Sequence, residues 1–396
     1  MILKNLSVLL GKDLEYISST NIQISNQRFK RIQKNIQPSS KEETFDCEGL
    51  LLIPGLINSH THIGDSIAKD ITLDKSVDER IHPVFGVKPK VLKKTKPSQL
   101  ASFMQNTCKS MIQKGITTFV DFREGGIEGI ELLKKTLMKV PIRSIILGRL
   151  EYYQNQAQIK RNIDLPSEKR AELSEILKNC DGIGISGANE NSNSVLNFYS
   201  KTKKLRAIHA AETNDSVSTS KHMTRKSEVI RALQIKPHFL IHMTQASKSE
   251  LFLVSKKTRG IVICPRANAA LAEGIPNLQM MFQTRCNIAI GTDNVMINSP
   301  DMFREMDYIW KVSMGINKKR IDPKQILKMA TVNAGKLLHK DIGVIERGKI
   351  ADCVLINKHS IDLEPMYSPH ASIVHRTSEN AIRSVIVGGK IVHGKI

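Results

Sequence analysis

Flat aromatic side chains and long apolar runs are both scarce in this chain. Phe, Trp and Tyr together make up 5% of its 396 residues, and there is one Trp. That is a poor supply of rings for stacking on nucleic-acid bases. No stretch of about 18 apolar residues occurs, which excludes a membrane-spanning helix. The first residues lack a long apolar core and a small-residue cleavage site, so we expect no signal peptide and a cytoplasmic protein.

Paired cysteines are also missing from the pattern. None of the six cysteines forms a Cys-x-x-Cys pair with another; they are Cys47, Cys108, Cys180, Cys264, Cys286 and Cys353. This spacing matches neither a cysteine metal site nor a disulfide framework. We therefore expect reduced thiols, most of them buried.

Acidic residues are too few to balance the basic ones. Lys and Arg number 59 and Asp and Glu number 38, which gives a net charge of +21. Such a charge attracts polyanions or reflects a lysine-rich proteome. The basic residues are spread over separate segments (88–96, 201–204 and 318–320), without a zinc finger, an RNP-like strand or an Arg-rich arm. We expect solvated faces and no specific nucleic-acid binding, and a phosphate-bearing substrate stays open.

What is present is a globular composition with two kinds of patterning. Residues 1–52 and 343–396 carry short β-prone runs with glycine turns, so the two ends are predicted to form one β domain. Residues 53–342 alternate apolar runs with amphipathic stretches and form a second predicted domain. Eight such βα units predict a TIM-type (β/α)8 barrel, and a doubly wound sheet is the alternative.

The predicted barrel strands are 52–58, 116–122, 142–148, 182–187, 205–210, 238–243, 260–264 and 287–292. The predicted helices between them are 98–114, 126–139, 168–179, 194–204, 224–234, 246–257 and 301–314.

Four of these strands end in histidine or aspartate. His60 and His62 follow the first apolar run, and residues two apart in a strand point to the same side. His209, His242 and Asp293 end three later runs. Buried ionisable groups cost several kcal/mol unless they are paired or bound to a metal, and imidazole suits zinc or iron. Because barrel active sites lie at the carboxyl ends of the strands, this pattern predicts a metal site there.

These motifs resemble the amidohydrolase superfamily along essentially the whole chain. The resemblance rests on the segments 54–62, 115–118, 209–212, 264–268, 291–294 and 343–352, and on His242. The nearest group is the aminohydrolase branch with cytosine deaminase, chlorohydrolase and methylthioadenosine/S-adenosylhomocysteine deaminase. The resemblance implies a (β/α)8 barrel with a small composite β-sandwich from both termini. The fourth strand (residues 181–189) offers no lysine to bridge two metals, so one metal is expected.

The resemblance also implies roles for individual residues. The metal ligands would be His60, His62, His209 and Asp293. Glu212 would carry protons, His242 would hold the attacking water or the substrate, and Asp293 would also accept a proton from the water. The implied reaction is hydrolytic deamination of an amino-substituted purine, pyrimidine, pterin or related nucleoside or nucleotide, with zinc or iron as the metal. A homodimer or homotetramer is implied in the same way.

Three points stay open in the sequence. The same residues could hydrolyse a cyclic amide or a chlorinated or alkylaminated triazine-like ring, and a catalytically silent barrel that acts as a scaffold or binds polyanions is a hypothesis of another class. Arg149, Asn189 and Arg266 follow strands and are candidates for substrate contacts. The long basic loop 63–97 is either a solvated lid or a contact for an anionic substrate.

Overall fold

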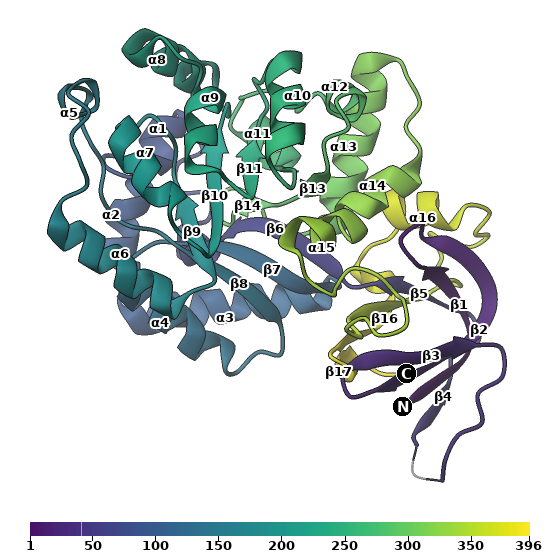
Figure 1. Ribbon diagram of the computed structural model, residues 1–396. Coiled ribbons are helices and arrows are strands. Elements are labelled where there is room, and N and C mark those ends of the chain that lie inside the picture. The colour runs from purple at the N-terminus through teal and green to yellow at the C-terminus, as the bar shows by residue number, and fades with distance from the viewer. Residues whose placement is uncertain (41) are drawn as a thin grey trace.

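The computed structural model describes residues 1–40 and 42–396 and contains two sheets (Figure 1). The larger sheet is parallel, and its hydrogen-bonded order is β13-β12-β11-β10-β9-β8-β7-β6-β14. Its strands are β6 (Leu56–His62), β7 (Ile116–Arg123), β8 (Arg143–Gly148), β9 (Gly182–Ile185), β10 (Leu205–Ala210), β11 (Phe239–His242), β12 (Ile261–Ile263), β13 (Ile288–Ile290) and β14 (Asp293–Asn294).

This sheet curls until its two ends meet. Two residues after β13 the chain enters β14, which pairs in parallel with β6. The junction is tied to the first strand, since the backbone N–H of Thr292 donates to the His60 carbonyl at 3.1 Å and to Asn58 Oδ1 at 3.0 Å. The prediction of a TIM-like α/β fold is confirmed, and each predicted strand run overlaps an observed strand.

The first predicted run, 52–58, is divided between the two sheets. Its beginning belongs to β5 (Leu50–Pro54), and after Gly55 the chain enters β6 of the parallel sheet. Gly55 is required at this switch because a Cβ atom there would lie 2.3 Å from Thr117 Oγ1. The apolar run therefore serves two sheets, a division that hydrophobicity alone does not reveal.

The smaller sheet is built from both ends of the chain. Its order is β17-β16-β15-β5-β1-β2-β3, with β4 paired to β1. Besides β5, its strands are β1 (Ile2–Leu10), β2 (Glu15–Ser25), β3 (Arg28–Gln33), β4 (Thr44–Asp46), β15 (Cys353–Asn357), β16 (Ile382–Val387) and β17 (Lys390–Gly394). All of these strands are hydrogen-bonded as one sheet, so the expected two layers of a sandwich are not confirmed.

Helices surround the parallel sheet (Figure 1). They are α1 (Val77–Ile81), α2 (Val87–Lys94), α3 (Pro97–Gln113), α4 (Gly126–Leu137), α5 (Gln156–Lys160), α6 (Ser167–Asn179), α7 (Asn193–Ser200), α8 (Asn214–Thr224), α9 (Glu228–Ala232), α10 (Lys248–Lys257), α11 (Pro265–Ala270), α12 (Leu278–Gln283), α13 (Met302–Asn317), α14 (Pro323–Met329), α15 (Val332–Leu338) and α16 (Pro369–His375). The described residues also form three short 3-10 helices: η1 (Ile63–Ala68), η2 (Leu233–Ile235) and η3 (Glu379–Ala381).

Several helices start at a side chain that caps the first turn. Ser192, Thr213 and Ser247 each accept a hydrogen bond from the backbone N–H three residues later. Such caps satisfy N–H groups that have no partner within the helix and stabilise it by about 1 kcal/mol. The caps lie three to seven residues after the ends of β9, β10 and β11, and they fix where each helix begins above the sheet.

Apolar side chains fill both faces of the parallel sheet. Every residue of β6 and β7 is buried, and the six cysteines are buried and free, as expected. No helix among the described residues has both the length and the apolar character needed to cross a bilayer. The polar residues at the carboxyl ends of the strands are exceptions to this apolar core, and they are described next.

Candidate metal centre and active site

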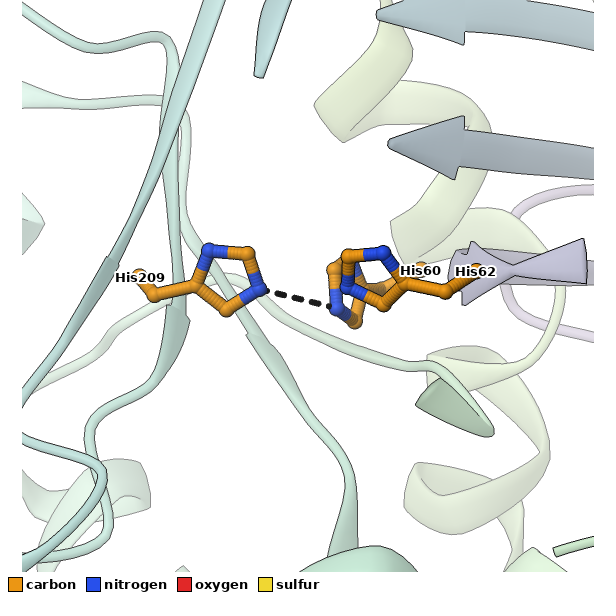
Figure 2. Close-up of side chains that lie close together, drawn as sticks. All are labelled: His60, His62 and His209. Carbon is orange, nitrogen blue, oxygen red and sulfur yellow. Dashed lines mark hydrogen bonds between the residues drawn. The ribbon is translucent and has the colours of Figure 1, made fainter. Parts of the chain in front are cut away.

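Three histidines from two strands converge at the carboxyl ends of the parallel sheet. His60 and His62 lie on β6, and His209 lies on β10 with its ring facing theirs (Figure 2). Nε2 of His209 is 3.2 Å from Nε2 of His60. Each of the three rings offers one nitrogen, and these three nitrogen atoms lie within 4.8 Å of one another. All three side chains are buried.

Asp293 joins this cluster from β14. Its Oδ1 atom lies 3.2 Å from His60 Nε2 and 3.6 Å from His62 Nε2. Oδ2 is buried and has no hydrogen-bond partner among the described residues. A buried carboxylate oxygen without a donor costs free energy unless a cation compensates it. Three imidazoles and one carboxylate form a donor set that suits a single divalent metal ion.

The histidines are held in the form that binds metals. Burial, together with the neighbouring imidazoles, lowers the pKa of His209 well below its usual range, and burial and Lys88 lower the pKa of His62 to about 3. Neutral imidazole is the ligating form. Nδ1 of His209 lies 3.0 Å from the carbonyl oxygen of Ile185, so the Nδ1–H donates there and Nε2 keeps its lone pair.

A second pair of ionisable groups lies beside this donor set. Glu212 follows β10 and His242 ends β11, and Glu212 Oε2 is 3.4 Å from His242 Nε2. On its other side, His242 Nδ1 faces the side-chain amide of Asn268 at 3.4 Å. His242 and Asp293 also share a metal-competent grouping with His60. A carboxylate in contact with an imidazole, next to a cation site, can move protons to and from a bound molecule.

Left-handed backbone conformations occur at these strand ends. Ala211, His242, Met243 and Asp293 all have positive φ, between 49° and 69°. Such conformations cost about 1–3 kcal/mol each for residues with a side chain and cluster at functional sites. The Ala211 backbone is held by Glu228, whose Oε2 accepts from the Ala211 N–H at 2.9 Å. Glu228 thus fixes the turn that presents Glu212.

The site opens into a pocket at the same end of the sheet. Its walls include the metal-ligand candidates His62, His209 and Asp293, and they include Glu212 and His242. The segment between η1 and α2 contributes further wall residues: Val77, Ile81, His82, Pro83 and, from α2, Lys88. The loop 63–97 therefore forms part of the pocket wall.

The candidates for substrate contacts do not all reach this pocket. Arg149 and Asn189 line it. Arg266 is not among the lining residues; its guanidinium lies 3.5 Å from Glu305 and 3.4 Å from the Ser299 carbonyl. Asn189 already donates to the Ser216 carbonyl at 2.8 Å, which fixes its amide.

Sequence reasoning overlooked the buried groups behind the ligands. Glu124, at the end of β7, accepts from His62 Nδ1 at 2.9 Å, and Asp65, Lys88 and Glu228 are buried around the same site. Glu124 lies two residues after the predicted strand 116–122, and this position was the available signal. The partners of Asp65 and Lys88 lie far away in the chain, so no local pattern indicated them.

The fold and this cluster define a hydrolase with one divalent-metal centre at the carboxyl end of a TIM-like barrel. The model of the amidohydrolase family matches residues 51–392. The chain belongs to the amidohydrolase family, in its aminohydrolase branch, and is a hydrolase that acts on C–N bonds.

Individual relatives cover nearly the whole chain. The "Putative aminohydrolase" of Methanothermobacter thermautotrophicus is 35% identical over 99% of both chains. The 5-methylthioadenosine/S-adenosylhomocysteine deaminase of Thermococcus sibiricus is 27% identical over 99% of this chain and 93% of its own. Among solved structures, the zinc complex of atrazine chlorohydrolase from Arthrobacter aurescens TC1 has a TM-score of 0.84 at 15% identity, covering 99% and 95% of the two chains.

Proposed function

We propose that this protein is a zinc-dependent, cytoplasmic deaminase of an amino-substituted heterocycle. The observation that carries the proposal is the contact of Glu212 with His242 beside a buried three-histidine, one-aspartate donor set. In this proposal the curled sheet is a (β/α)8 barrel spanning about residues 53–342, and both termini supply the second domain. A relative named as a methylthioadenosine/S-adenosylhomocysteine deaminase and a structural neighbour that holds zinc support the proposal.

Each site residue has one task in the proposed reaction. His60, His62, His209 and Asp293 would hold the metal, which supplies Lewis-acid activation of water by lowering its pKa. Asp293 accepts a proton from the attacking water. Glu212 delivers a proton to the ring nitrogen next to the reacting carbon, and His242 donates a hydrogen bond to the oxygen on which charge develops.

The proposed reaction balances as a hydrolysis. The water oxygen bonds to the ring carbon that carries the amino group, and the C–NH2 bond breaks. One water proton ends on the ring nitrogen and the other leaves with the amine as ammonia. The product is the corresponding ring carbonyl, and neither an oxidant nor a second substrate is consumed.

The charges at the pocket favour an uncharged ring. Of the cations that line it, Lys88 contacts Glu124 at 2.6 Å, and Arg149 lies 4.0 Å from the same carboxylate. Glu190, Glu212 and Glu228 also line the pocket. The excess positive charge of the chain is therefore not concentrated where a phosphate would bind. We infer that Arg149 and Asn189 contact polar ring atoms instead.

The experiment is ammonia release by zinc-loaded protein from a panel of amino-heterocycles. The panel pairs free bases, nucleosides, deoxyadenosine thioethers and pterins with phosphorylated forms. We expect release from at least one uncharged member and its loss in Glu212→Gln. Release of chloride from a chlorotriazine, or opening of a cyclic amide, without ammonia would replace deamination by the corresponding hydrolysis. A preference for phosphorylated members would overturn the inference of an uncharged ring.

A further inference from the structure

One buried lysine connects the pocket wall to two of the proposed metal ligands. Lys88 lies on α2, and its side chain is 5% exposed although it carries a charge. Its Nζ atom is 2.6 Å from Glu124 Oε1 and 3.4 Å from Asp65 Oδ2. A buried ammonium group is tolerated only where such partners compensate its lost hydration.

The first carboxylate leads to His62. Glu124 Oε1 lies 2.9 Å from His62 Nδ1, so it accepts the Nδ1–H and leaves the Nε2 lone pair facing the donor set. A carboxylate in this position orients a ligating histidine and fixes its tautomer. Lys88 contacts the same Oε1 atom and holds it in place.

The second carboxylate leads to the strand of Asp293. Asp65 Oδ2 accepts from the side chain of Asn294 at 2.7 Å, and Oδ1 accepts from the backbone N–H of Met296 at 3.1 Å. Asn294 is the residue after Asp293 in β14. Lys88 therefore reaches the backbone that positions Asp293 through one intervening side chain.

Lys88 also belongs to the loop that walls the pocket. Val77, Ile81 and Pro83 line the pocket a few residues before α2. The other three lysines of α2 are exposed: Lys90, Lys93 and Lys94. Burial is therefore specific to Lys88 and is not a general property of this basic segment. The ammonium group of Lys88 links α2 to the candidate ligands through Glu124 and Asp65.

We propose that Lys88 is a positioning residue that couples the placement of the pocket wall (residues 77–94) to metal binding by His62 and Asp293. This proposal rests on the metal-binding part of the proposed function. It adds two consequences: metal binding orders the pocket wall, and loss of the Lys88 charge weakens metal binding. Without the ammonium group, Asp65 would lose its contact with Lys88, and Glu124 would keep only the more distant guanidinium groups of Arg123 at 3.8 Å and Arg149 at 4.0 Å. The acceptor of His62 Nδ1 would then be held less firmly.

The test compares Lys88→Met with Lys90→Met, which removes an exposed lysine from the same helix. Zinc affinity is measured by competition with a chelator, and backbone amide exchange is followed with and without zinc. We expect zinc affinity about 10–100-fold lower in Lys88→Met, the range seen when groups behind a ligand are removed, and unchanged in Lys90→Met. Lys88→Arg, which keeps the charge, should recover part of the affinity.

Exchange in the unmodified protein tests the coupling without any variant. Zinc should slow exchange in residues 77–94 and leave α16, on the other side of the molecule, unaffected (Figure 1). The proposal is overturned if Lys88→Met binds zinc with the affinity of the unmodified protein. It is also overturned if zinc does not change amide exchange in residues 77–94. A merely structural lysine would lower the melting temperature without changing zinc affinity. Neither readout uses a substrate, so a protein that passes both but releases no ammonia refutes the deaminase proposal alone.

Discussion

Glu228 offers a quantitative test of how the turn that carries Glu212 is held. Its Oε2 atom accepts from the Ala211 N–H at 2.9 Å and from the Ser216 hydroxyl at 2.7 Å. In Glu228→Leu the buried Ala211 N–H loses its acceptor, which costs about 1–3 kcal/mol, and the lost serine bond adds about 1 kcal/mol. In Glu228→Gln the amide oxygen can accept both bonds. Both variants are uncharged at this position. We therefore expect the free energy of unfolding of Glu228→Leu to be about 2–4 kcal/mol lower than that of Glu228→Gln.

The assay is thermal unfolding of both variants. With roughly 2.1 cal/mol/K per residue, the 396-residue chain has an unfolding entropy of about 0.8 kcal/mol/K, so the difference corresponds to about 2–5 °C in Tm. Equal melting temperatures for Glu228→Leu and Glu228→Gln would refute the argument, because the two hydrogen bonds would then contribute nothing. We also expect the Glu228→Leu protein to keep its zinc but to release ammonia more slowly than the Glu228→Gln protein.

The same position gives a pH dependence with a definite sign. Burial raises the pKa of Glu228 above its ordinary value of 4.5, outweighing the bonds from Ser216 and Ala211. The protonated form is therefore favoured in the folded protein, and this stabilisation is lost as the pH rises from 4.5 through the raised pKa. Glu228→Gln does not titrate. Its Tm relative to the unmodified protein should increase over that interval and then level off; a relative Tm that falls instead would contradict the raised pKa.

Three other predictions concern the donor set and its strand. Glu212→Gln should abolish ammonia release but bind zinc stoichiometrically, whereas loss of zinc would mean that Glu212 is a ligand. Removing zinc with a chelator should lower the stability by about 2.7 kcal/mol relative to zinc at 100 times its Kd, or about 3 °C, and no shift would contradict a site on the folded protein. Gly291→Ala places a Cβ 2.7–2.9 Å from Cβ and backbone atoms of His60 and should cost about 1–3 kcal/mol with weaker zinc binding. Gly315→Ala, in α13 with no atom within 4 Å of the new Cβ, should instead raise the Tm, and equal effects of the two substitutions would refute the steric argument.

Strand and helix locations could be predicted well because apolar runs and amphipathic stretches alternate along residues 53–342. Each of the eight apolar runs overlaps a strand, and helices such as α3 and α13 begin within one residue of their predicted start. The two layers of a sandwich were not confirmed, because β5 pairs with both β1 and β15 and so joins the strands of the two chain ends into one sheet. Pairing between strands so far apart in the chain cannot be predicted from local patterns. For the loop 63–97 the sequence left open a solvated lid or a contact for an anionic substrate, and the structure shows that the loop contains buried Lys88 and lines the pocket. Net charge does not distinguish a lysine in solvent from one that contacts two carboxylates.

The sequence by itself determined the types of the candidate ligands, their order and their places at strand ends, since parallel strands in a curled sheet bring their carboxyl ends together. It also determined the resemblance that named the family. Only the tertiary structure decided which groups stand behind the ligands. Glu124 reaches His62 across 62 positions, and Asn294 reaches Asp65 across 229. Tautomers, buried charge pairs and pocket walls depend on such distant contacts, and local periodicity carries no information about them.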